Sequence, residues 1–171
     1  MPIQKIMTYP YPTLLSEASD VVFPLSNEDK ALLRNMWDTV DGIGVGLAAP
    51  QLGIAKKICI ISLSKTMIPK NVKIRNNFAI INPIIKEYSN NTKRMVEGCL
   101  SFPNQWWEIE RPSDIVLEYT DEKGKRQRMK ATGWMSRVIQ HEVDHLYGKV
   151  FINAGGKKIQ EHELGDRDIV D

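Results

Sequence analysis

The segment 134–146 constrains the fold more than any other part of the chain. Its apolar residues recur at helical intervals, and it contains two of the three histidines within QHEVDHLYG (140–148). This spacing predicts a helix. His141 and His145 are four residues apart on it, so both imidazoles leave the same face and can bind one metal ion.

Glu142 directly follows the first histidine and is rotated away from the metal-binding face. It can therefore reach a water molecule that the metal activates without being a ligand itself. A metal hydrolase needs this arrangement for its general base. The alternative is a surface helix that merely carries His and Glu.

Two histidines leave such a site incomplete, so the remaining sequence must supply a third ligand. The metzincin pattern has a third histidine six residues after the second, with a glycine midway. Gly148 fits this pattern, but Phe151 occupies the ligand position. A downstream glutamate, as in thermolysin-like enzymes, could only be Glu161 or Glu163, which lie in a short tail.

Cys99 is the better candidate for the third ligand, because Gly98 lets the backbone approach closely. The alternative for Cys99 is a buried, inert thiol. Cys59 alternates with apolar residues of an expected strand, which favours core packing, and His162 is expected to be solvated. A Cys/His/His set with an open position lowers the pKa of bound water and suits hydrolysis of a carbonyl compound.

The run GVGLAAPQ (44–51) consists of small residues and ends in a side-chain amide. It has no Lys followed by Ser or Thr, which argues against a phosphate-binding loop. Two interpretations stay open. The run forms a tight turn under the core, or Gln51 donates a hydrogen bond to a developing oxyanion.

The composition predicts one globular domain over residues 1–171, with 150–171 as a C-terminal tail. The net charge of +2 is too small to predict nucleic-acid or membrane partners. Only two cysteines occur, so no disulfide framework is implied. We see no signal peptide and no long apolar run, and we therefore expect a cytoplasmic protein.

The other segments predict an α+β fold, with mixed, mainly antiparallel β-sheets packed around the C-terminal helix and one further N-terminal helix. Ser26 is a good N-cap for that early helix, with Asp29 at the third helical position. Gly42 ends its apolar pattern, which consists of Leu32, Leu33, Met36, Trp37 and Val40. Strands are expected over 57–63 and 78–82, the latter ended by Pro83, and a hairpin over 115–120 and 127–132; residues 64–77 are expected to form a surface loop.

Three motifs, GVGLAAPQ (44–51), EGCLS (97–101) and HEVDHLYG (141–148), closely resemble in this order the signatures of the peptide deformylase family. The family's general pattern extends from the early helix through Val150. The resemblance implies an enzyme that removes the formyl group from the N-terminal formylmethionine of newly made proteins and releases formate. It also implies one divalent metal ion on Cys99, His141 and His145, usually Fe²⁺, with Ni²⁺, Co²⁺ or Zn²⁺ able to substitute.

The same resemblance implies roles for further residues. Glu142 would activate the water and pass its proton to the leaving amine, while the Gln51 amide and the Leu100 backbone N–H would stabilise the oxyanion. The partners would be N-formylmethionyl nascent peptides and, transiently, the ribosome. Six residues form the implied substrate-binding set, either by lining the methionine pocket or by pairing with the substrate backbone: Val45, Gly46, Glu97, Gly98, Trp134 and Val138. For Trp134 and Val138 the alternative is plain packing of the helix against the sheet.

The sequence departs from the family pattern in three places. Trp106 and Trp107 stand where many relatives have a basic or small residue, and Ser136 replaces the usual alanine. The tail lacks a Lys/Arg-rich helix that many members have, which puts that mode of ribosome docking in doubt. A general HExxH metallopeptidase and a non-catalytic metal-binding protein are the competing hypotheses. Cys99 with Gln51 argues against the first, and Glu142 argues against the second.

Overall fold

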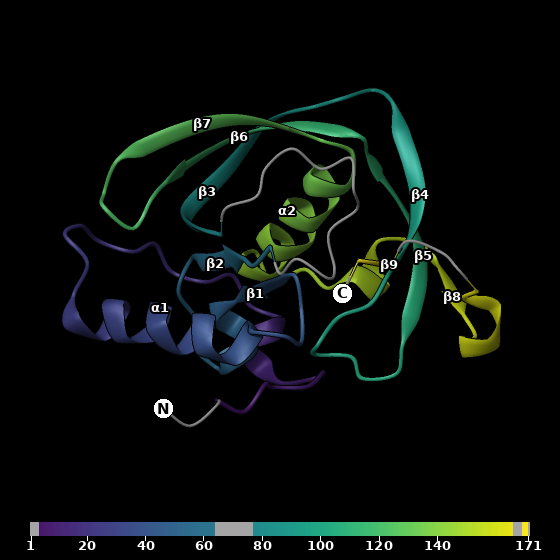
Figure 1. Cartoon of the computed structure of the whole chain (residues 1–171), viewed down its shortest axis with the longest axis horizontal. Helices are drawn as coiled ribbons and strands as arrows, with labels where there is room; N and C mark the ends of the chain where they lie inside the picture. The colour runs from purple at the N-terminus through teal and green to yellow at the C-terminus, as the bar shows by residue number, and fades with distance from the viewer. Residues whose placement is uncertain (1–3, 64–76, 166–168, 171) are drawn as a thin grey trace.

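The helix that carries both histidines, α2 (Gly133–Leu146), lies in the middle of the molecule, with β-strands arching around it (Figure 1). The computed structural model describes residues 4–63, 77–165 and 169–170. The α+β fold class is confirmed. The loop predicted over 64–77 lies outside the described residues except for Asn77.

Two sheets enclose α2, and all their strand pairs but one are antiparallel. The first sheet has the order β1-β2-β3-β6-β7 and the second has the order β8-β5-β4-β9. The exception is β9, which runs parallel to β4. The strands are β1 (Gly46–Ala48), β2 (Ile58–Ile61), β3 (Phe78–Tyr88), β4 (Thr92–Glu97), β5 (Trp106–Pro112), β6 (Asp114–Thr120), β7 (Arg126–Thr132), β8 (Lys157–Ile159) and β9 (Ile169–Val170).

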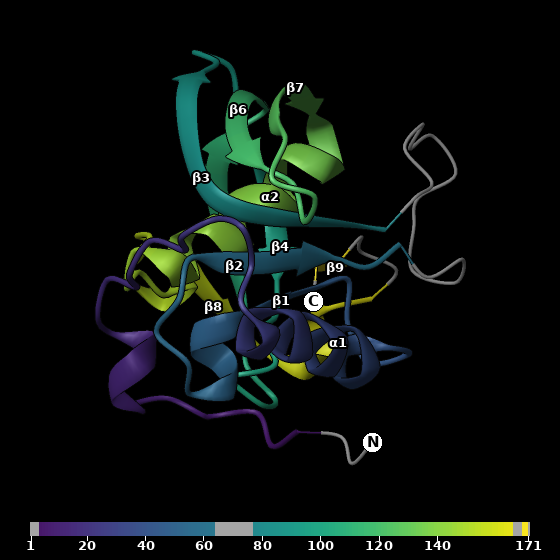
Figure 2. The same cartoon turned by 90° about the vertical axis from the view of Figure 1, so that its left-hand side faces the viewer.

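Strand β2 is buried on both faces, because α2 covers one face and α1 (Asn27–Val40) covers the other (Figure 2). Ile58 and Ile60 belong to the apolar cluster that includes α1, whereas Cys59 and Ile61 belong to the cluster that includes α2. This double burial explains the continuous apolar run in the sequence. It also confirms the core position predicted for Cys59, whose pKa is raised by burial and by the charge of Glu142.

Strand β3 does not end at Pro83 as predicted but continues to Tyr88. The register with β6 shifts between Ile81 and Ile84, and Asn82 adopts a positive φ of 49° there. The side chain of Asn82 bonds both the N–H and the C=O of Val21, each at 2.8 Å. Proline has no N–H for a regular ladder, and a bulge is the position in a sheet where it is tolerated.

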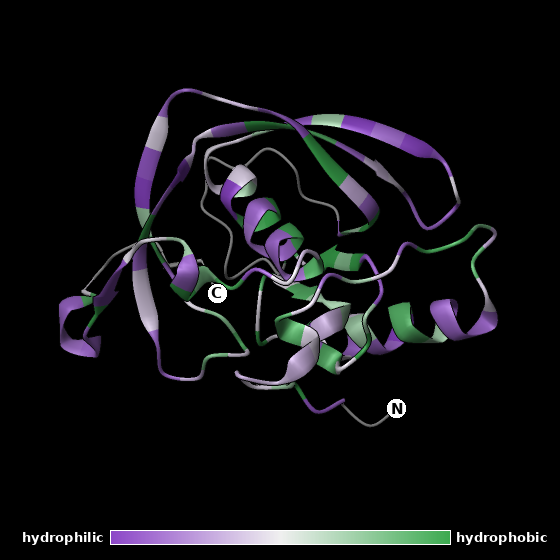
Figure 3. Cartoon of the chain, turned by 180° about the vertical axis from the view of Figure 1, so that it is seen from behind, coloured by the Kyte–Doolittle hydropathy of each residue, from purple (hydrophilic) through white to green (hydrophobic). Residues whose placement is uncertain are grey.

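The expected hairpin is confirmed as β6 and β7, and both helices begin and end within one or two residues of the predicted positions. Colouring by hydropathy shows hydrophobic strands in the middle of the molecule and hydrophilic residues along much of the hairpin that arches over α2 (Figure 3). Within the described residues, no helix is both long and apolar enough to cross a membrane. Beyond α2 the described tail forms short 3-10 turns and the strands β8 and β9.

The N-terminus of α1 yields a stability prediction. Ser26 and Asp29 form a reciprocal capping box, and Asp29 also pairs with Lys56. Burial alone would raise the pKa of Asp29, but hydrogen bonds from Lys56 and Ser26 outweigh it and lower the pKa below its usual 3.8. Asp29→Ala should therefore lower the free energy of unfolding by about 1–2 kcal/mol at pH 7.

This difference should depend on pH in a defined direction. A lowered pKa in the folded state stabilises the fold above the unfolded-state pKa, and the stabilisation is lost as the pH falls through the folded-state value. In urea unfolding, the difference between parent and variant should therefore begin to narrow below about pH 4 and close below the lowered folded-state pKa. Asp38→Ala, at an exposed position of the same helix, is the control and should change little. An equal gap at pH 3 and pH 7 would contradict the assigned ion pair.

Candidate metal centre

Three buried side chains from two parts of the chain converge beside α2. Cys99 follows β4, and His141 and His145 lie one turn apart on α2. Their potential ligand atoms all lie within 4.8 Å of one another, and Cys99 Sγ is 3.4 Å from His145 Nε2. Metal bonds of about 2.0–2.3 Å in a tetrahedral site would place ligands roughly 3.4–3.8 Å apart. The Cys/His/His set therefore fits one metal ion.

The orientation of His141 is fixed by a carboxylate. Its Nδ1 lies 2.9 Å from Oε2 of Glu97, which leaves Nε2 to face the other two ligands. Metal-binding histidines commonly have such a partner, which sets the tautomer and raises the basicity of the ligand nitrogen. Burial lowers the pKa of His145 well below its usual value, and the neighbouring His141 adds to this effect.

Glu97 is the centre of a buried charge network. Arg111, on β5, donates from Nε at 2.6 Å and from Nη2 at 3.0 Å, while Arg137, on α2, donates from Nη1 at 2.7 Å. Burial alone would raise the pKa of Glu97, but His141 and Arg111 outweigh it and hold the pKa far below its usual range. The resemblance to the family implied substrate binding for Glu97. The structure instead commits its fully buried carboxylate to His141 and the two arginines.

The predicted oxyanion donor Gln51 also lies at the metal centre. The backbone N–H of Ala48 donates to Gln51 Oε1 at 2.9 Å, so the NH₂ group of the Gln51 amide points away from Ala48. Gln51 Nε2 lies 3.7 Å from Cys99 Sγ. Leu100 directly follows the cysteine, and within the described residues its backbone N–H makes no hydrogen bond. The structure thus places the Gln51 amide beside Cys99, and Leu100 is the next residue in the chain.

The side chain of Glu142 lies against strand β1. A Cβ atom built on Gly46 would be 2.6 Å from Cδ of Glu142, so no larger residue fits there without moving the carboxylate. Glu142 is 5% exposed. A nearly buried carboxylate one residue after a candidate ligand has the position that a general base requires.

The residues expected to contact substrate fall into two groups. Val45, Trp134 and Val138 are all buried in the cluster that α2 forms with the first sheet. Gly98 lines a small cavity of about 150 Å³ together with Cys99, and Trp106 forms part of its wall. The aromatic residue that departs from the family pattern therefore stands next to the metal centre.

The alternative third ligands lie elsewhere. Phe151 is buried, and its ring centroid is 5.8 Å from that of His141, so it packs against a ligand and supplies none. Glu161, His162 and Glu163 are exposed in the 3-10 turn η4 (Glu161–Glu163). The metal-ligand group within the described residues contains none of the four. The structure thus supports neither the metzincin nor the thermolysin-like ligand pattern.

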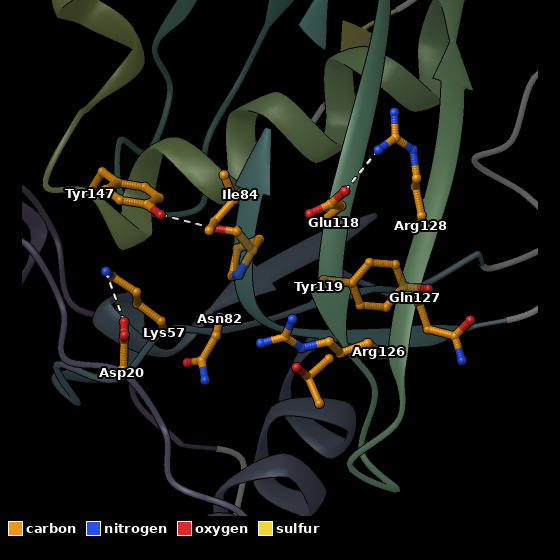
Figure 4. A pocket seen from close by; sticks show the side chains of 12 residues that line it. Asp20, Lys57, Asn82, Ile84, Glu118, Tyr119, Arg126, Gln127, Arg128 and Tyr147 are labelled. Carbon is orange, nitrogen blue, oxygen red and sulfur yellow. Dashed lines mark hydrogen bonds and ion pairs between the residues drawn. The ribbon is translucent and has the colours of Figure 1, made fainter. Parts of the chain in front are cut away.

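A larger hollow of about 530 Å³ lies near the end of α2, between the N-terminal segment and strands β3, β6 and β7 (Figure 4). None of the three ligands lines it. Some of its polar groups pair with one another: Lys57 with Asp20, Arg128 with Glu118, and the Tyr147 hydroxyl with the Pro83 carbonyl.

The residues that support the metal ligands were not predicted from the sequence. Arg137 precedes His141 by four residues and so lies on the metal-binding face of the helix, a spacing that could have revealed it. Arg111 and Asp144 are joined by a 2.7 Å ion pair across elements, which no local pattern indicates. Ser101 belongs to the EGCLS motif, but its side chain was given no role.

Known proteins resemble this chain over most of its length. The family model for polypeptide deformylase matches residues 3–160. The peptide deformylase of Pelagibacter ubique is 39% identical over 154 residues, which are 90% of this chain and 86% of that protein. The peptide deformylase of Wolbachia sp. subsp. Drosophila simulans is 38% identical over 156 residues, covering 89% and 87%.

Solved structures agree with the sequence relatives. Peptide deformylase from Ehrlichia chaffeensis superposes with a TM-score of 0.81 at 32% identity, over 90% of this chain and 88% of that one. The Acinetobacter baumannii enzyme with bound Met-Ala-Ser gives 0.82 at 29% identity, over 90% and 98%. The Synechococcus elongatus enzyme in complex with actinonin gives 0.79 at 32% identity, over 96% and 83%.

The fold and the site together define a metal-dependent amide hydrolase, with a buried Cys/His/His donor set and a buried carboxylate, that of Glu142, on an α+β frame. The chain belongs to the peptide deformylase family. It is an enzyme that removes the N-formyl group from the N-terminal formylmethionine of newly synthesised proteins and releases formate. The metallopeptidase alternative is not favoured.

The position of Glu97 yields a prediction about metal affinity. Glu97→Gln removes the charge that balances two buried arginines and makes His141 a less basic ligand. Metal affinity should fall roughly 10- to 100-fold, measured by competition with a chelator under anaerobic conditions. Glu118→Gln is the control. It removes a carboxylate that pairs with the exposed Arg128, so it should retain the parental metal affinity. Parental affinity in Glu97→Gln would refute the role of this carboxylate.

Proposed function

We propose that Cys99, His141 and His145 hold one divalent metal ion at the deformylation site, and that this ion is Fe²⁺. The close approach of the three donor atoms carries the proposal. When bound, the ion supplies Lewis acidity, which lowers the pKa of water and polarises a carbonyl group. A thiolate with two imidazoles also suits Ni²⁺, Co²⁺ and Zn²⁺, so these ions can substitute.

Glu142 acts as the general base and then as the general acid. Its carboxylate takes a proton from the water whose oxygen attacks the formyl carbon. When the C–N bond breaks, Glu142 returns that proton to the leaving amine, so formate and a free N-terminal amine are formed. Contact with Gly46 supports this role, because it confines the carboxylate to the side of the site that adjoins β1.

Gln51 Nε2 and the backbone N–H of Leu100 stabilise the oxyanion. As water adds to the formyl carbon, the carbonyl oxygen gains negative charge, and donors already in place bind that charge more strongly than the neutral carbonyl. Gln51 Nε2 lies within 3.7 Å of a metal ligand, and its amide is oriented by a backbone bond rather than by the substrate. This preorganisation supports the assignment.

The methionine side chain of the substrate packs against Val45, Trp134 and Val138. These residues share one apolar cluster beside the ligands on α2, and a mostly apolar pocket is typical of small-ligand sites. The related Acinetobacter enzyme binds Met-Ala-Ser, a peptide that begins with methionine. The backbones of Val45, Gly46 and Gly98 pair with the peptide as strands do. The position of β1 supports this pairing, because β1 forms one edge of its sheet and an extended peptide can add there as a further strand.

The cellular setting follows from the substrate. Formylated N-termini belong to newly synthesised proteins, so we place the enzyme in the cytoplasm with transient contact to the ribosome. The described tail ends in β8, η4 and β9.

The decisive experiment measures formate release from a formyl-Met peptide by anaerobically purified enzyme of known metal content. The parent should release formate, and Glu142→Gln should retain the metal but lose at least 100-fold in kcat. Glu122→Gln, in the exposed hairpin turn, is the control and should match the parent. Metal analysis that finds another ion in the active enzyme would overturn the assignment of Fe²⁺.

The contact between Gly46 and Glu142 allows a second test of the base. Gly46→Ala should lower kcat at least tenfold, because the new methyl group displaces the carboxylate, whereas the metal ligands are untouched. In Gly44→Ala the tightest contact of the added methyl would be the end of the Leu100 side chain at 3.1 Å, and the next atoms lie at 3.6 Å, so this control should lose much less. Equal losses in steady-state assays of the two variants would show that Gly46 does not set the position of Glu142.

A further inference from the structure

Ser101 carries a buried hydroxyl beside Gln51. The residue is 1% exposed, and its Oγ accepts a hydrogen bond from Gln51 Nε2 at 3.3 Å. Ser101 is no metal ligand and is not part of the substrate pocket. Its one side-chain hydrogen bond within the described residues leads to the proposed oxyanion donor.

The orientation of the Gln51 amide follows from its partners. The Ala48 N–H needs an acceptor, and it finds Oε1 of Gln51 at 2.9 Å. The NH₂ group must therefore point toward Ser101 and Cys99. A side-chain amide carries two N–H bonds that diverge in one plane. If one of them is directed at Ser101 Oγ, the plane of the amide is fixed, and the second N–H is directed toward the metal centre.

Ser101 is itself held in a fixed position relative to Cys99. Both residues lie in one turn, closed by a 2.8 Å bond from Phe102 N–H to the Cys99 carbonyl. The Ser101 carbonyl also accepts from Tyr9 N–H at 3.0 Å. The Ser101 hydroxyl thus couples the position of the turn that carries Cys99 to the orientation of the Gln51 amide. Gln51 lies 48 residues before Cys99 in the chain.

We propose that Ser101 is a positioning residue for the oxyanion donor. Its hydroxyl accepts one N–H of the Gln51 amide and thereby directs the other N–H at the oxygen of the formyl group. The inference rests on the proposed role of Gln51. Without the hydroxyl, the amide loses an acceptor and turns about its last torsion angle. Stabilisation of the transition state then weakens, while binding of the uncharged substrate changes little.

The first test separates kcat from KM. Ser101→Ala should lower kcat about tenfold or more while KM and metal content stay near parental values and the thermal midpoint falls only slightly. Ser101→Thr keeps an oxygen acceptor and should retain most of the parental kcat. Equal loss of kcat in both variants, or a loss that appears in KM alone, would overturn the proposal.

A double-mutant cycle identifies the route of the effect. If Ser101 acts through Gln51, adding Ser101→Ala to Gln51→Ala should cause no further loss of kcat, whereas independent roles would multiply the two losses. Multiplied losses would overturn the positioning role and leave Gln51 as donor. A Gln51→Ala variant with parental kcat would instead refute the proposed role of Gln51, so the two failures are distinguishable.

The chain offers a matched control for the loss of a buried Gln–Ser hydrogen bond. Ser136, on α2, is fully buried, and its Oγ accepts from Gln140 Nε2 at 2.9 Å. Ser136→Ala removes the same type of bond without touching Gln51, so it should lower stability slightly and leave kcat unchanged. A loss of kcat in Ser136→Ala equal to that in Ser101→Ala would show a general structural effect and overturn the proposal.

Discussion

The buried carboxylate of Glu97 is the interaction on which the rest of the site depends. It joins β4 to β5 through Arg111 and to α2 through Arg137 and His141. Burying charges is costly unless each has partners, and removing one partner leaves the others uncompensated. The ion pairs therefore permit essentially one arrangement of α2 against the second sheet. Cys99 follows Glu97 by two residues, so the same network places the third ligand opposite the two histidines.

Strand β1 and the turn after it position Glu142 and Gln51, whereas the ion-pair network of the second sheet fixes the ligands. Strand β1 places Gly46 against Glu142, and the turn after β1 places Gln51 beside Cys99. Helix α2 belongs to both halves, since one face carries His141 and His145 and the adjoining position carries Glu142, the proposed base. Hydrolysis of a formamide needs both halves together: an ion to polarise the carbonyl, and donors and a base arranged around the same atom.

The sequence predicted what depends on local spacing and missed what depends on distant partners. The helical periodicity around His141 and the capping pair at α1 act within a few residues, so both were found. Strand β4, with the sequence TKRMVE, is exposed over half its length, and its polar composition gave no strand signal. The partners of Glu97 lie 14, 40 and 44 residues away. Pairing at that range is decided by how the sheets close around α2, which no local pattern contains.

The N-terminal segment illustrates the same point. Its Met7 N–H bonds the Gln51 carbonyl at 2.7 Å and its Tyr9 N–H bonds the Ser101 carbonyl at 3.0 Å, contacts that no local pattern indicates. The Tyr9 ring stacks on Phe102, which packs edge-on against Phe151, and Phe151 in turn contacts the ring of His141. The segment thus ties the turn that contains Gln51 to the turn that contains Cys99 and Ser101. Two motifs far apart in sequence need such a tie, because catalysis tolerates errors of well under 1 Å between donor and metal.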